Sequence, residues 1–255
     1  MTMLRTVIRA GHVTGLPSWP ALDRWRHETR RAGWAAWITP VVIAVCGGGF
    51  LALLGAVHGP LGRTAGSLLE AVIPLGAAIC VAGLAGGDPA IELQLSLPTR
   101  YRTTLARRYA LVAGSASLVA VVFSEVLAAA GAWSAPTGAL AGQLTWLVPL
   151  LVLCGVAAAV ASLTASGRAA AAVVSALWTA EEWFKEGLIG AGWSRALYLF
   201  ATARADQPPF LVRGQLTGAW LVNRGVLLAV CPLLLATAYA ALRRPDRLLS
   251  RRTEP

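Results

Sequence analysis

Long apolar runs dominate this chain and limit what it can fold into. Six runs stand out: residues 34–57, 67–87, 109–133, 140–165, a fifth that starts near Arg168, and 218–242. About 20 mostly apolar residues are needed to cross a bilayer as a helix, because a helix satisfies its own backbone hydrogen bonds in lipid. The pattern predicts an all-α, polytopic membrane bundle of about six transmembrane helices.

Composition agrees with lipid as the solvent for much of the chain. Of the 255 residues, 56% are hydrophobic and only 13% are charged, whereas a soluble domain carries roughly a quarter charged residues. The net charge of +10 does not indicate a nucleic-acid partner, because the arginines sit at the ends of the apolar runs. The fifth run is the weakest, since Glu181, Glu182, Lys185 and Glu186 follow its clean stretch of residues 169–180.

The distribution of arginines predicts the orientation. Most lie in an N-terminal arm (1–33), a segment between the second and third runs (88–108), and a C-terminal tail (243–255), whereas the connection at 181–217 holds few. Basic residues concentrate on the cytoplasmic side of membrane proteins. We therefore expect a multi-pass protein of the cell membrane, a single transmembrane domain over 1–255, with both termini in the cytoplasm and 181–217 as the outer connection.

The N-terminal arm has an amphipathic character of its own. Trp19, Leu22 and Trp25 recur every three residues among arginines, which favours a short helix lying on the inner membrane surface. A solvated basic linker is the alternative. The outer connection likewise leaves two interpretations, a gate that dips into the membrane or a surface cap, because its apolar stretches at 187–190 and 197–200 are too short to cross.

The segment between the second and third runs carries the most distinctive pattern. Apolar Ile91, Leu93, Leu95 and Leu97 alternate with polar side chains, and Pro98 separates this stretch from a basic one. Here the chain resembles the permease subunits of ABC-2-type transporters. The following residues carry the resemblance: Glu92, Leu93, Leu95, Ser96, Pro98 and Arg107, with Arg108 beside them. The last run, which opens with Trp220 and Arg224 and ends in arginines, is also similar to the last span of that family.

The resemblance implies a function and a set of partners. In the family, this segment and the arginine-bearing helix after it dock onto an ATP-binding subunit. The resemblance therefore implies an exporter permease coupled to a separate ATPase chain, paired with a second copy or a related permease, and in contact with membrane lipid. An ATPase-independent secondary transporter and a non-transporting scaffold are the alternatives.

No catalytic, cofactor or metal site is predicted in the chain itself. The only lysine is Lys185, so no phosphate-binding loop of the Gly-Lys-Ser/Thr type exists. Glu181 and Glu182 resemble the opening of a membrane-peptidase motif, but the only histidines are His12, His27 and His58, all before the second run. The four cysteines lie in four different apolar runs, which favours small buried side chains over a metal site.

Three charged residues fall within the predicted spans and are the candidate intramembrane polar sites. They are Glu70, Glu125 and Arg224. A charge at the centre of a span costs about 2.5–3.5 kcal/mol, so it usually faces protein or water. Glu125 and Arg224 lie at matching depths, roughly 10 Å inside the outer ends of their helices. This permits an ion pair between them; the alternative is that each faces an outer vestibule separately.

Overall fold

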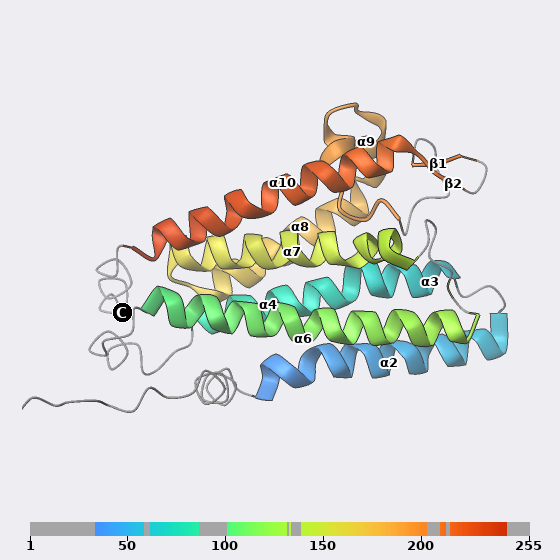
Figure 1. The fold of residues 1–255 in the computed structure, drawn as a ribbon, viewed down its shortest axis with the longest axis horizontal. Coiled ribbons are helices and arrows are strands. Elements are labelled where there is room, and N and C mark those ends of the chain that lie inside the picture. The colour runs from blue at the N-terminus through green and yellow to red at the C-terminus, as the bar shows by residue number, and fades with distance from the viewer. Residues whose placement is uncertain are drawn as a thin grey trace, which may run out of the picture.

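The structure, a computed structural model, is a bundle of long helices with one small hairpin (Figure 1). It describes residues 34–58, 62–86, 101–131, 133, 139–202, 210–212 and 215–243. The elements run as follows: α2 (Trp34–His58), α3 (Gly62–Ser67), the π-helix η1 (Leu68–Val72), α4 (Ile73–Gly86), α6 (Tyr101–Ala129), α7 (Ala139–Thr164), α8 (Gly167–Trp183), α9 (Lys185–Gly190), the 3₁₀ helix η2 (Ser194–Leu197), β1 (Leu211–Val212), β2 (Gln215–Leu216) and α10 (Gly218–Ala241).

Four helical stretches in the described residues are long and apolar enough to cross a membrane. They are Thr64–Leu84, Tyr101–Ala129, Ala141–Thr164 and Gly218–Ala241. The first of these joins α3, η1 and α4 end to end. The predicted helical character is confirmed, and four helices have the length and composition to cross a membrane; the count of about six stays a prediction. The predicted amphipathic helix of the N-terminal arm lies outside the described residues.

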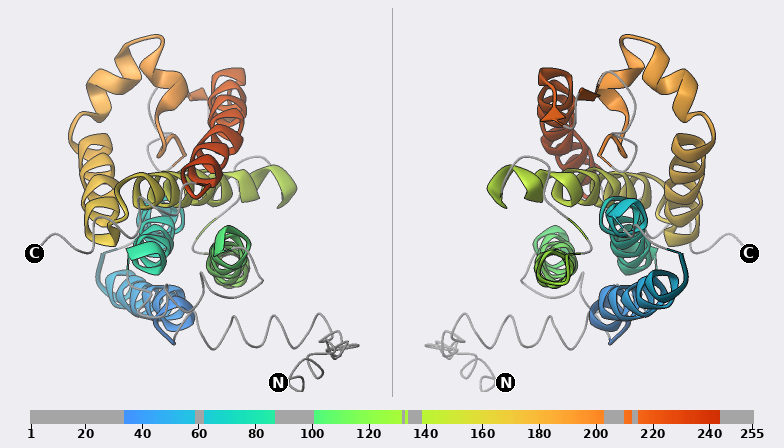
Figure 2. Two further views of the ribbon diagram at one scale, coloured as in Figure 1. Left: turned by 90° about the vertical axis from the view of Figure 1, so that its left-hand side faces the viewer. Right: turned by 90° about the vertical axis from the view of Figure 1, so that its right-hand side faces the viewer.

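Helix α7 occupies the middle of the bundle. It packs along α4 on one side and along α10 on the other, and the end-on views show α6 beside α4 and α2 beyond α4 (Figure 2). Alanines fill much of the contact between α4 and α7, including Ala77, Ala78, Ala157 and Ala161, all fully or almost fully buried. Small side chains let helices approach closely where lipid removes any hydrophobic drive for association.

Helix α6 begins earlier than the apolar run predicts. It starts at Tyr101, not near residue 109, and its first two turns bury Tyr101, Thr104, Leu105 and Arg108. These positions share one face of a helix. Tyr101 and Leu105 pack with Leu242 at the end of α10. Hydropathy marks only the apolar part of this helix, whereas its amphipathic start is held by contact with α10.

One end of the bundle collects the positive charge. The start of α6, the start of α8 and the end of α10 lie together at this end (Figure 1), and they carry Arg102, Arg107, Arg108, Arg168 and Arg243. We call it the basic end. The α4–α6 connection leaves and re-enters the bundle here, because α4 ends and α6 begins at this end.

A glycine permits close packing at the turn from α7 into α8. A Cβ atom on Gly167 would lie 2.6 Å from the carbonyl oxygen of Ala82, a backbone atom that cannot swing aside. The turn is fixed by Ser166, whose Oγ accepts a hydrogen bond from the amide of Ala169 at 3.2 Å. Helix α8 therefore begins in direct contact with the backbone of α4.

The substitution Gly167→Ala is expected to lower the free energy of unfolding by about 1–3 kcal/mol, the usual cost of overpacking. Titration of purified protein with a denaturing detergent, followed by circular dichroism, measures this loss. Gly83→Ala is the matched control, because a Cβ on Gly83 meets nothing within 4 Å. Equal stability of the two variants would contradict the close approach of α8 to α4.

Candidate functional site

Buried polar side chains from three helices converge on one irregular segment. They are Glu70 of η1, Glu181 of α8, and Asn223 and Arg224 of α10, each less than a tenth exposed. All of them bind residues 195–202, which follow α9 and lead toward the hairpin. We call residues 194–202 the fold-back segment, because the chain arches from α8 toward α10 and turns back into the bundle here (Figure 2).

An ion pair between Glu70 and Arg224 forms the centre of this site. Arg224 Nη2 donates to Glu70 Oε1, and both side chains are almost wholly buried. Arg224 Nη1 also donates to the carbonyl oxygen of Leu199 at 2.8 Å, and Nη2 to Thr202 Oγ1 at 2.9 Å. Glu70 Oε1 accepts from the amide of Thr202 at 2.9 Å. The pair thus joins η1 and α10, which are distant in the sequence, and holds the end of the fold-back segment between them.

The indole of Trp220 completes the surroundings of Arg224. The guanidinium lies 5.4 Å from the centre of the Trp220 ring, within the range of a cation–π contact. Trp220 Nε1 also donates to Thr202 Oγ1 at 2.9 Å. One residue of the segment, Thr202, therefore receives hydrogen bonds from two side chains of α10 and gives one to Glu70.

Asn223 and Glu181 bind further backbone groups of the segment. Asn223 Nδ2 donates to the carbonyl oxygens of Arg195, Ala196 and Tyr198 at 2.9, 3.2 and 2.9 Å. Glu181 Oε2 accepts from the amide of Leu199 at 3.1 Å. Non-helical backbone at membrane depth is tolerated only where protein or water satisfies its polar groups. These side chains therefore make the fold-back conformation possible.

Aromatic side chains also pack within and around the fold-back segment. Tyr198 and Phe200 are fully buried and meet edge to face, with ring centres 6.3 Å apart. Phe210, at the start of the hairpin, stacks on Tyr198 at 6.4 Å, and Trp178 of α8 meets Phe200 at the same distance. The segment is thus held by apolar packing as well as by buried hydrogen bonds.

The ion pair between Glu125 and Arg224, one of the two arrangements that the sequence permits, does not form. Arg224 pairs with Glu70, and Glu125 lies on the exposed face of α6, opposite the buried face of Ala120, Phe123 and Leu127. The depth of a residue along its helix can be counted from the sequence. Which neighbouring helix each face of that helix contacts cannot be read from the sequence. Glu70 comes from a neighbouring helix that does face α10 across the fold-back segment.

The predicted ATPase-coupling residues fall into two groups. Glu92, Leu93, Leu95, Ser96 and Pro98 lie outside the described residues. Arg107 is half-buried and Arg108 is buried on the first turns of α6 at the basic end. Their role in coupling stays a prediction, and the burial of Arg108 implies that it would act through the fold of α6.

Asn223 and Glu181 are site residues that sequence reasoning did not select. Asn223 stands next to Arg224 in an otherwise apolar run, and two adjacent polar residues at this depth are the signal for a buried polar partner. Glu70 lies within a π-helical turn, a feature often found at functional sites. In the part of the chain that the structure describes, no three His, Cys, Asp or Glu side chains could hold a metal ion together.

Comparison of the chain with protein-family models, curated proteins and solved structures found no match.

Proposed function

We propose that the chain crosses the membrane six times, with both termini in the cytoplasm. Helix α2 has 25 residues, or about 37 Å at 1.5 Å per residue, which suffices for a crossing. Helix α8 has 17 residues and ends at Trp183 and Phe184, which are 80% and 66% exposed. Exposed aromatic rings at a helix end suit the membrane interface. The basic end then faces the cytoplasm.

We further propose that the protein is the permease subunit of an ABC-2-type exporter that works with a separate ATP-binding subunit and a second permease chain. The observation that carries this proposal is the gathering of helix ends at the basic end. The connection bearing Glu92 and Pro98 starts and finishes there, beside the arginine-rich start of α6. A force applied to this connection would act directly on α4 and α6.

The opposite end of the bundle supports a transport role. The fold-back segment places irregular backbone inside a helical bundle, as transporters do around their pathways. The two buried acidic side chains that hold this segment are already bound. Glu70 accepts from the amide of Thr202 and pairs with Arg224, and Glu181 accepts from the amide of Leu199. This favours a mechanical, ATP-driven cycle over a proton or ion relay through those groups.

The proposal is tested by purifying the tagged full-length chain from its host and reconstituting it with the ATPase that accompanies it. We expect Glu92→Ala and Pro98→Ala each to abolish most ATP-driven transport while the complex still hydrolyses ATP. Gln94→Ala is the matched control in the same segment and is expected to keep transport. Transport and ATP hydrolysis are measured on the same proteoliposomes.

Other results would overturn the assignment. Full ATP-driven transport by the Glu92 and Pro98 variants would remove the docking role of this segment. A chain that purifies alone and supports ion-driven flux would be a secondary transporter, and one with neither partner nor flux would be a scaffold.

A further inference from the structure

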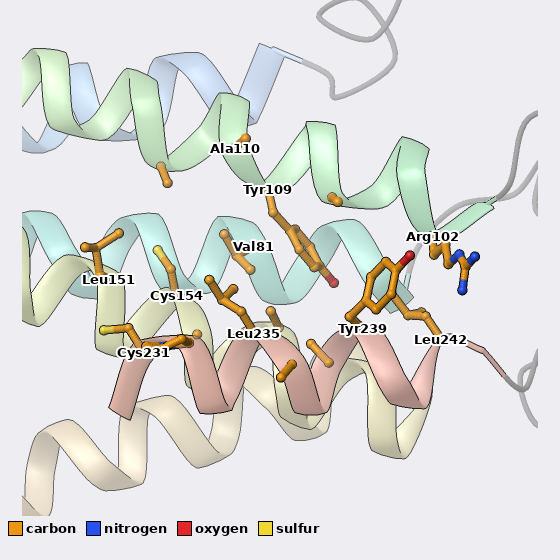
Figure 3. A pocket seen from close by; sticks show the side chains of 17 residues that line it. Val81, Arg102, Tyr109, Ala110, Leu151, Cys154, Cys231, Leu235, Tyr239 and Leu242 are labelled. Atoms are coloured by element: carbon orange, nitrogen blue, oxygen red, sulfur yellow. The ribbon is translucent and has the colours of Figure 1, made fainter. Parts of the chain in front are cut away.

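A cavity of about 650 Å³ opens between α6, α7 and α10, toward the basic end (Figure 3). Small residues on α6, such as Ala106, Ala110 and Ala113, keep it wide, and Gly155 and Ala158 of α7 form part of its floor. Its lining is apolar apart from Arg102 and Tyr109, Tyr239 and the thiols of two cysteines. We call it the α6–α10 groove.

Positive charge marks one end of this groove. Arg102 lines it, and its guanidinium lies 4.9 Å from the centre of the Tyr239 ring. The guanidinium of Arg243 lies 5.7 Å from the same ring. Two cations thus meet at a half-exposed tyrosine, and among the described residues neither arginine has an ion-pair partner.

The length of the groove suits one acyl chain. Its lining on α10 runs from Cys231 to Leu242, about 17 Å along the helix. One leaflet contributes about half of a hydrocarbon core that is about 30 Å thick. An acyl chain lying in the groove would therefore end near the membrane centre, with its phosphate at the level of Arg102 and Arg243.

We propose that the α6–α10 groove binds an anionic phospholipid from the leaflet at the basic end, with one acyl chain along α10 and the phosphate between Arg102 and Arg243. This inference rests on the proposed membrane topology but not on the transporter assignment. A second copy of the chain is a poorer occupant. Two copies inserted in the same direction would bring the same arginines together at one level, where like charges repel.

The test uses the full-length protein in detergent, titrated with phosphatidylglycerol or phosphatidylcholine and measured by native mass spectrometry. We expect phosphatidylglycerol, which is anionic, to bind more tightly than phosphatidylcholine, which has no net charge. The double variant Arg102→Gln, Arg243→Gln should weaken that binding about 25-fold, from roughly a fivefold contribution of each arginine near an anionic headgroup. Arg168→Gln is the matched control, because it removes an exposed arginine at the same end that does not line the groove.

A second pair of variants tests the acyl-chain site. Ala236→Trp fills the groove and should reduce phosphatidylglycerol binding at least fivefold, whereas Ala229→Trp, on an exposed part of α10 outside the groove, should not. Both positions are exposed, so the fold should tolerate both side chains. The proposal fails if the two lipids bind equally, if the arginine variant binds like the control, or if Ala236→Trp splits an oligomer and leaves lipid binding unchanged. That last result would make the groove a contact between copies.

Discussion

Replacing Arg224 by methionine is expected to lower the free energy of unfolding by about 3–5 kcal/mol, the usual cost of leaving one member of a buried ion pair alone. Methionine keeps most of the volume but leaves the Glu70 carboxylate without its cation. The carbonyl oxygen of Leu199 and Thr202 Oγ1 each lose a donor as well. Detergent-induced unfolding of the purified protein, followed by tryptophan fluorescence, measures the loss.

Partner variants separate the ion pair from the other contacts of Arg224. The double variant Glu70→Met, Arg224→Met should be more stable than Arg224→Met, because no buried charge is left unpaired. It should remain below the wild type, because Leu199 still lacks its donor. Glu125→Gln, which neutralises an exposed acidic residue on α6, should change stability little. A double variant less stable than the single one would mean that Glu70 and Arg224 do not stabilise one another.

Substitution of Asn223 has the second largest expected effect. Asn223→Ala removes the Nδ2 donor that three carbonyl oxygens of the fold-back segment share. Each buried acceptor left without a donor costs at least about 1 kcal/mol, and one amide group supplies two hydrogens, so we expect a loss of at least about 2 kcal/mol. Thermal unfolding in detergent micelles measures it.

The aspartate variant sharpens this test. Asn223→Asp would bring carboxylate oxygens against the carbonyl oxygens of Arg195 and Tyr198, so it should be less stable than Asn223→Ala. Thr237→Ala is the control on the same helix: Thr237 is exposed and bonds only within α10, to the carbonyl oxygen of Leu233 at 2.8 Å. If Asn223→Asp matched the wild type, the amide would not be donating to the segment.

The helices themselves were predictable because lipid allows so few alternatives. An apolar run of about 20 residues has to close its hydrogen bonds internally, so its position in the sequence nearly fixes the helix. The predicted start at residue 140 and end at residue 165 differ by one residue from those of α7, and the run at 218–242 matches α10 as closely. The early start of α6 was missed because arginines make this stretch polar in sequence, whereas the helix there is held by Tyr101 and Leu105, which pack with Leu242.

The site was harder to predict, since it depends on tertiary contacts. The sequence marked Glu70 and Arg224 as costly residues in lipid, and the structure places both in one cluster. It could not reveal which helices turn these residues toward each other. It also could not reveal the fold-back segment, whose backbone is bound by side chains from η1, α8 and α10.

The Glu70–Arg224 pair also constrains the order in which the protein can mature. The two residues stand 154 positions apart, and α10 is the last helix of the described chain to be synthesised. Until it arrives, Glu70 has no cation beside it, and residues 195–202 lack the donors of Asn223 and Arg224. The contacts that Glu70 and residues 195–202 make with Arg224 and Asn223 can therefore form only after α10 has been made.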